Sequence, residues 1–120
     1  YNNEAILKQI EENEKIQAVF FDDILLSDAT VTLWNQFITD FKNPGLEIDL
    51  DSIENMLSSA ATPSGFSLNG IRKLILGSSK QFAYLHICEG ASEMEDGRTS
   101  SFTGKSIAYL ITDFLKSYTL

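Results

Sequence analysis

Two aspartates separated by one residue, Asp49 and Asp51, are the strongest candidates for chemistry in this sequence. They belong to the stretch 46–53, in which apolar and acidic residues alternate. This alternation predicts a β-strand, and a strand points both carboxylates to one face. Neighbouring carboxylates repel each other and are costly to bury unless a cation or a proton neutralises them, so a hard divalent metal is expected there. A solvated loop start or a helix N-cap is the alternative interpretation.

Further acidic residues come directly after two other apolar stretches. If all these stretches are parallel strands, their carboxyl ends lie at one edge of a sheet, where open α/β sheets bind ligands. At that edge Glu89 could neutralise a metal or bind a cationic substrate group. The alternatives are a carboxylate held by backbone amides of the next turn for Glu89, and a loop start or helix cap for Asp22 and Asp23. The residues expected to meet at this edge are Asp22, Asp49, Asp51 and Glu89.

The elements that must position these carboxylates alternate between helix and strand. Apolar runs predict strands, and apolar residues at helical spacing predict amphipathic helices between them. This order favours an α/β fold with a parallel sheet and helices on both faces. Strands are expected near 17–21, 46–50 and 82–88, and helices from Asn2 or Asn3 to about 15, and near 31–41, 53–57, 67–77 and 103–115.

The composition limits the partners of this chain of 120 residues. Nine Lys and Arg against seventeen Asp and Glu give a net charge of −8, so we expect no nucleic-acid partner and no anionic membrane surface. No apolar run approaches transmembrane length, and the start lacks the shape of a signal peptide. Cys88 is the only cysteine, which excludes an intrachain disulfide and is compatible with a reducing, cytoplasmic compartment.

His86 and Cys88 are the other side chains with chemical potential. His86 is the only histidine, so this chain alone cannot build a histidine-rich metal site. Inside a strand, we expect it to be a buried or half-buried side chain with a satisfied hydrogen bond, not a ligand. Cys88 could act as a nucleophile only with a base nearby, and none is evident in the sequence. We expect Cys88 to be buried and inert.

Several stretches together resemble the ureohydrolase family, which comprises arginase, agmatinase and formimidoylglutamase. The stretch Glu47–Ile53 resembles the third signature of that family, where a strand ends in Asp-x-Asp. Ala61–Phe66 stands where the family has a Thr-Pro followed by glycines, and Leu85–Ala91 resembles the next family strand, which ends in a substrate-contacting Glu. The last helix, 104–117, resembles the closing helix of the family. The residues of these three stretches are most similar to those of the formimidoylglutamase-like branch.

The resemblance implies a hydrolase with a pair of manganese ions. Asp49 would bridge both ions, and Asp51 would bind one ion and assist proton transfer as the catalytic carboxylate. Glu89 would pair with the cationic head of an amidino or guanidino substrate. The implied reaction converts N-formimidoyl-L-glutamate to glutamate and formamide, and an arginase that converts arginine to ornithine and urea is the alternative. The implied fold is the three-layer arginase-like fold, with residues 1–120 as the carboxyl-terminal part of a single domain and the complete enzyme a homo-oligomer.

Two departures from the family pattern qualify this interpretation. Glu54 stands where the family usually has Asp-Pro, and the upstream Gly-Gly-Asp-His and Asp-Ala-His-x-Asp motifs are absent from this sequence. Because those motifs supply the other metal ligands and the catalytic histidine, the resemblance implies that the site needs an amino-terminal part of the fold. A second hypothesis, from another class, is a non-catalytic α/β interaction module whose acidic edge holds Mg²⁺ or no ion. A receiver-like domain with Asp22 and Asp23 after its first strand is an example.

Overall fold

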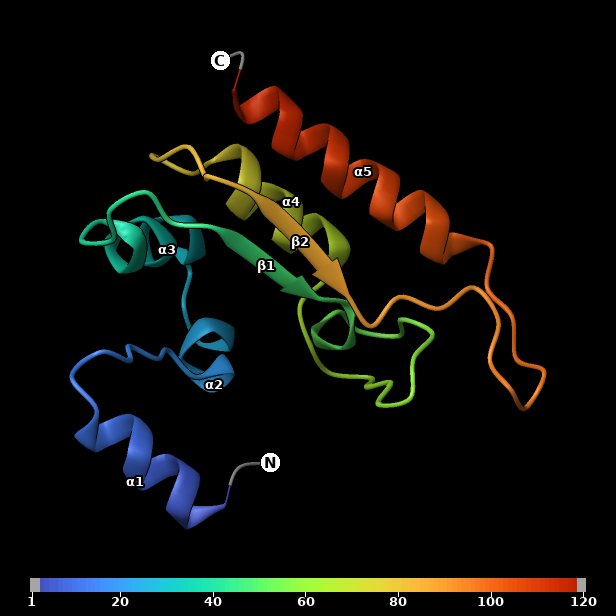
Figure 1. The fold of residues 1–120 in the computed structure, drawn as a ribbon, viewed down its shortest axis with the longest axis horizontal. Coiled ribbons are helices and arrows are strands. Elements are labelled where there is room, and N and C mark those ends of the chain that lie inside the picture. Colours follow the sequence, from blue (N-terminus) through green and yellow to red (C-terminus); the bar gives the residue numbers. More distant parts are fainter. Residues whose placement is uncertain (1–2, 119–120) are drawn as a thin grey trace.

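The computed structural model describes residues 3–118 and contains helices around a small parallel sheet (Figure 1). The order along the chain mixes helix and strand as expected, so the protein is of the α/β type. The elements are α1 (Glu4–Glu12), α2 (Phe21–Leu25), α3 (Thr30–Ile38), β1 (Leu46–Asp49), the short 3₁₀ helix η1 (Leu50–Ser52), α4 (Leu68–Leu76), β2 (Leu85–Cys88) and α5 (Phe102–Ser117).

The sheet consists of β1 and β2, which lie side by side and run parallel (Figure 1). Leu46 lies opposite Leu85, and Asp49 lies opposite Cys88. Parallel neighbours need a crossover connection, which α4 provides here. The predicted parallel pairing of the second and third expected strands is therefore confirmed, and their carboxyl ends meet at one end of the sheet.

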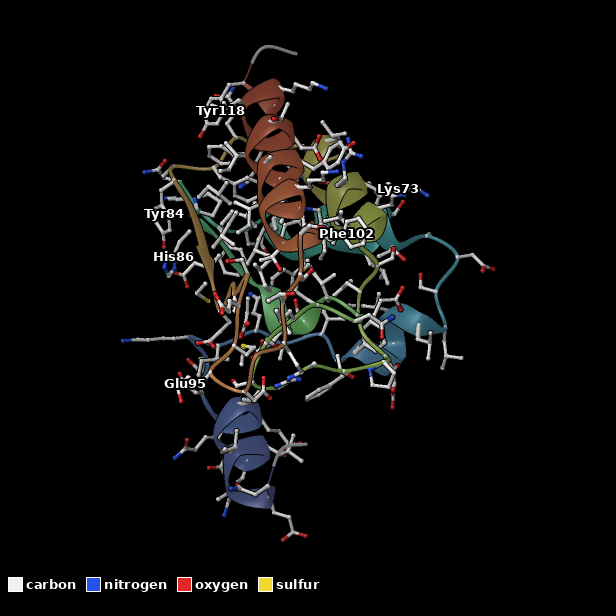
Figure 2. All side chains as sticks on the ribbon, turned by 90° about the vertical axis from the view of Figure 1, so that its right-hand side faces the viewer. Lys73, Tyr84, His86, Glu95, Phe102 and Tyr118 are labelled. Carbon is white, nitrogen blue, oxygen red and sulfur yellow. The ribbon has the colours of Figure 1, made fainter. Side chains whose placement is uncertain are left out.

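One face of this sheet forms the core. Leu46 and Ile48 of β1 are buried in a cluster with Ile75 of α4 and Leu110 of α5. The other face is open, and Figure 2 shows His86 and Tyr84 of this region on the side away from Lys73 of α4. Within residues 3–118 the helix layer that we expected on this second face is therefore not found.

The prediction of a strand near 17–21 is wrong. Phe20 has an extended backbone, but residues 17–20 form no strand, and Phe21 starts the helix α2. A short apolar run fits a buried strand or a buried helical turn equally well, so its periodicity could not decide. Asp22 and Asp23 fall in the first turn of α2, where the helix dipole favours negative charge. Hence these two aspartates do not follow a strand.

The helix boundaries follow the capping signals of the sequence. The Asn3 side chain accepts a hydrogen bond from the Ile6 N–H, and the Ser67 side chain accepts one from the Gly70 N–H. Asn2, the other candidate cap of α1, lies outside the described residues. The prediction of a short helix at 53–57 is wrong, because the helical turn in this region is η1, which ends at Ser52. None of the helices in residues 3–118 is long and apolar enough to cross a membrane.

Candidate functional site

The two aspartates meet because Asp49 caps the turn that carries Asp51. Asp49 Oδ1 accepts a hydrogen bond from the Asp51 N–H at 2.9 Å, and the Ser52 hydroxyl donates to the Asp49 carbonyl oxygen at 2.6 Å. β1 ends at Asp49, so Asp51 lies in η1. The expectation that strand alternation aligns both carboxylates is therefore wrong for Asp51. The side-chain cap brings the two residues together instead.

The segment 62–66 holds this turn in place. The Phe66 N–H donates to the Ser52 carbonyl oxygen, and the Glu54 N–H donates to the Phe66 carbonyl oxygen, both at 2.9 Å. A Cβ atom at position 65 would collide with the Ser52 carbonyl oxygen, so Gly65 is required for this close approach. The sequence analysis singled out the motif 61–66 but did not predict this contact with Ser52.

Asp51 carries an unusual oxygen. Its Oδ1 atom is buried and has no hydrogen-bond partner within the described residues. A buried carboxylate oxygen without a partner is costly, because water no longer solvates it. A cation or a proton at this position would remove the cost. This observation concerns one oxygen of Asp51, and the metal site expected for the pair stays a prediction.

The thiol of Cys88 lies within the electrostatic reach of four carboxylates. Burial raises the pKa of the Cys88 thiol, and the negative charges of Asp49, Glu89, Glu47 and Asp51 raise it further, in that order. The thiol is half-buried and stays protonated beyond the usual range of a cysteine. These effects support the expectation of an inert cysteine, and they show that both strand ends contribute negative charge to one region.

Glu89 follows β2 directly and lies in a left-handed backbone conformation, with φ of 62°. Residues other than glycine rarely adopt this backbone conformation, and those that do concentrate at functional sites. The next residue, Gly90, packs so closely that an added Cβ would lie 3.0 Å from Leu50 Cδ1. The chain after β2 thus rests on η1, at the same end of the sheet as Asp49 and Asp51.

The carboxylate of Glu89 is exposed and makes no hydrogen bond or ion pair with residues 3–118. The alternative interpretation, a carboxylate held by backbone amides of the next turn, is therefore wrong. Asp22 does not follow a strand as expected, since it is an exposed residue in the first turn of α2. His86 was expected to be at least half-buried, but its side chain is 60% exposed. Its Nδ1 atom lies 3.5 Å from Glu47 Oε1 on the open face of the sheet.

The donor set fits only part of a metal site. Asp49 and Asp51 offer carboxylate oxygens, which hard divalent ions prefer, and the buried Asp51 Oδ1 lacks a partner. No three His, Cys, Asp or Glu side chains in residues 3–118 gather into a group that could hold a metal ion. Because Mn²⁺ and Mg²⁺ take about six donors, further ligands are needed besides these two.

Comparison of the chain with known protein families, curated proteins and solved structures found no match. Membership of the ureohydrolase family therefore stays a hypothesis, carried by the motifs within 47–53, 61–66 and 85–91.

Proposed function

We propose that this chain carries part of the active site of a manganese-dependent enzyme that hydrolyses a C–N bond in a formimino or amidino amino acid. The proposed reaction converts N-formimidoyl-L-glutamate to glutamate and formamide. The observation that supports it most is the buried, unpartnered Oδ1 of Asp51 beside Asp49 at the carboxyl end of a parallel strand. This end of an α/β sheet is where ligands bind.

Asp49 and Asp51 would hold the manganese ions, two of them in the complete enzyme. When bound, such ions lower the pKa of a coordinated water and polarise the carbon that it attacks. The remaining ligands would come from polypeptide outside these 120 residues, in a cytoplasmic homo-oligomer with the three-layer fold of the family.

Glu89 would bind the cationic head of the substrate. Its carboxylate is exposed and has no partner within the described residues, and Glu89 directly follows β2, the strand that pairs with β1. A carboxylate can accept two parallel hydrogen bonds from an amidinium or guanidinium group. The overall charge of −8 also favours the approach of a cationic substrate.

The carboxylate of Asp51 would accept a proton from the attacking water. One of its oxygens is buried without a hydrogen-bond partner, so a proton donor placed there would relieve the cost of that burial. The same residues would serve an arginase, since the guanidinium of arginine offers the same bidentate donors. Release of formamide or of urea distinguishes the two substrates.

Calorimetric titration of the 120-residue chain with Mn²⁺, alongside assays for formamide and urea, tests this proposal. We expect weak Mn²⁺ binding, no turnover, and a further loss of Mn²⁺ affinity in Asp51→Asn, because a carboxamide lacks the charge that neutralises the ion. Glu54→Gln is the matched control, since Glu54 is an exposed carboxylate that η1 does not include. Equal affinity in the wild type and Asp51→Asn would contradict a metal role for Asp51. Tight binding of two ions with turnover would contradict the need for further ligands.

A further inference from the structure

A pocket lies between the two loops that leave the carboxyl ends of the paired strands. One loop follows β1 and η1, the other connects β2 to α5, and both lie beyond the same end of the sheet (Figure 1). The pocket has a volume of about 500 Å³, and small-molecule sites usually measure about 300–1,000 Å³. Residues 55–57 and 61–63 line it from the first loop, and residues 98–100 line it from the second. The pocket therefore lies at the same end of the sheet as the two aspartates of the candidate site.

Backbone hydrogen bonds hold the first wall of the pocket next to η1. The Asn55 N–H donates to the Thr62 carbonyl oxygen at 2.7 Å, and Ile53 pairs with Phe66 in an isolated parallel bridge. Asn55 has a φ of 60°, which asparagine tolerates better than most residues do. Because this residue comes shortly after η1, the pocket borders the turn that presents Asp51.

The second wall is a hairpin that presents Arg98. The Ser100 N–H donates to the Ser92 carbonyl oxygen at 2.9 Å, and the Met94 N–H donates to the Arg98 carbonyl oxygen at 2.8 Å. The turn of this hairpin contains Gly97 with a φ of 90°, a conformation that glycine adopts without steric cost. The backbone of Arg98 is therefore fixed at the point where the chain returns from the turn to the pocket.

Asp96 holds the Arg98 side chain in one orientation. Its Oδ2 atom accepts a hydrogen bond from Arg98 Nε at 2.8 Å, and its Oδ1 atom accepts one from the Arg98 N–H at 3.1 Å. Asp96 does not line the pocket, whereas Arg98 does. Within residues 3–118 no acceptor binds the two terminal nitrogens of this guanidinium. Their N–H donors are therefore available for a ligand.

The pocket offers hydrogen-bond donors around a single positive charge. Among the described residues that line it, Arg98 alone is charged. The Asn55 side-chain amide has no hydrogen-bond partner in residues 3–118, and Ser100 Oγ accepts from the Phe102 N–H at 3.2 Å, which leaves its hydroxyl proton to donate. A guanidinium flanked by amide and hydroxyl donors is suited to a carboxylate. This character contrasts with the carboxylates at the neighbouring candidate site and with the net charge of −8.

We propose that Arg98 determines specificity by binding a carboxylate of the substrate, while Glu89 binds its cationic head. This inference rests on the proposed function, since it assigns the opposite end of the same molecule. Formimino and amidino amino acids carry both a cation and a carboxylate, whereas the corresponding amines carry the cation alone. Arg98 thus selects the amino acids over the amines.

Binding of L-glutamate to the 120-residue chain tests the carboxylate site without metal or turnover. NMR signals of the side-chain N–H groups of Arg98 and Asn55 report on the pocket. We expect both signals to shift saturably, and Arg98→Gln to weaken the binding by about 10- to 100-fold, from the loss of hydrogen bonds to a charged group. Formamidine, which has the cation but no carboxylate, should leave both signals unchanged. Absence of the glutamate shifts, or equal shifts with formamidine, would overturn the proposal.

Lys73→Gln is the matched control for charge. It removes one positive charge from an exposed position of α4, and Figure 2 shows Lys73 apart from Glu95, which belongs to the loop that carries Arg98. Charges separated by more than the Debye length are largely screened, so the affinity for glutamate should stay within about twofold. An equal loss of affinity in Lys73→Gln and Arg98→Gln would show that net charge alone governs binding and would overturn the site.

Steady-state kinetics of the complete enzyme test the selection itself. Arg98→Gln should lower kcat/KM for N-formimidoyl-L-glutamate by about 10- to 100-fold, mainly through a higher KM. For N-formimidoyl-butylamine, which has the same head but no carboxylate, kcat/KM should change by less than about twofold. Equal losses for the two substrates would overturn the role of Arg98 in specificity.

The binding and kinetic measurements separate this inference from the proposed hydrolysis. If the wild-type enzyme releases no formamide while the chain binds glutamate at Arg98, the proposed hydrolysis is wrong and the carboxylate site is supported. If Arg98→Gln releases formamide from N-formimidoyl-L-glutamate with an unchanged KM, the hydrolysis is supported and the assignment of Arg98 is wrong.

Discussion

The carboxylate of Asp49 caps the turn that presents Asp51, with 2.9 Å between Asp49 Oδ1 and the Asp51 backbone nitrogen. One oxygen of Asp49 is thereby committed to the backbone, and the other remains available for a ligand. The same residue thus serves both the local fold and the proposed metal site. Substitutions that keep or remove the cap can separate these roles.

Asp49→Asn should keep the cap, because the amide oxygen still accepts the Asp51 N–H, while Asp49→Ala should lose it. We expect Asp49→Ala to cost about 1 kcal/mol of unfolding free energy, by analogy with other side-chain caps, and Asp49→Asn to cost much less. Both variants should lose Mn²⁺ affinity. Urea unfolding and Mn²⁺ titration measure the two effects; equal stability of both variants would show that the cap contributes nothing.

Gly65→Ala should destabilise the turn at the site. The added methyl group collides with the Ser52 carbonyl oxygen, and overpacking of this kind typically costs about 1–3 kcal/mol. Gly104→Ala is the control, since no atom lies within 4 Å of the added carbon and the residue belongs to α5, where alanine is favoured by about 1 kcal/mol. Thermal unfolding should therefore shift in opposite directions, and a stabilised Gly65→Ala protein would contradict the close approach.

The reactivity of Cys88 should depend on its acidic neighbours. Burial and then the charge of Asp49 raise the pKa of the thiol, so Asp49→Asn should lower that pKa and speed alkylation by iodoacetamide at mildly alkaline pH. Asp22→Asn, which changes an exposed residue of α2, should leave the rate unchanged. A rate that follows the pH profile of a free thiol in the wild type would show that the neighbours have no effect.

The same shift has a consequence for stability. Because the pKa of Cys88 is higher in the folded than in the unfolded protein, the folded state holds the proton to higher pH. The stabilising contribution is fully present below the ordinary thiol pKa and is lost as the pH rises through the raised folded pKa. Cys88→Ala should remove this part of the alkaline loss of stability.

Arg72 and Asp113 join α4 to α5. Arg72 Nε donates to Asp113 Oδ2 at 2.7 Å, its guanidinium lies over the Tyr109 ring, and Asp113 is fully buried. Arg72→Met should lower the melting temperature strongly, because it leaves a buried carboxylate without its partner. Lys73→Met, at the exposed neighbouring position, should change it little. Equal melting temperatures of the Arg72→Met and Lys73→Met variants would show that the Arg72–Asp113 ion pair does not stabilise the packing of α4 on α5.

Sequence patterns predicted the parts of this fold that local chemistry decides. The start of α1 after Asn3, the helix expected near 67–77 and the parallel pairing of β1 with β2 agree with the expectations. Each depends on a capping side chain, a glycine or an apolar run whose type is clear from its neighbours. The parallel arrangement followed from the helix between the two strands.

The errors arose where distant contacts decide the structure. Residues 17–20 have the composition of a strand, but a strand needs a partner, and pairing is not encoded in the segment itself. The meeting of Asp49 with Asp51 was predicted for the wrong reason, since a side-chain cap creates it. The packing of Gly65 on Ser52 and of Gly90 on Leu50 could not be predicted, because each joins segments that are remote in sequence.

The most direct test of the proposed function is the rate of formamide release from N-formimidoyl-L-glutamate, with Mn²⁺, by the complete enzyme that contains these residues. We expect Asp51→Asn to lose most of the activity, by a factor of at least about 100, since the carboxylate would both hold the metal and accept the proton. Glu54→Gln should retain activity close to that of the wild type. Near-normal turnover and manganese content in Asp51→Asn would contradict the proposal and make Asp51 a residue of the fold alone.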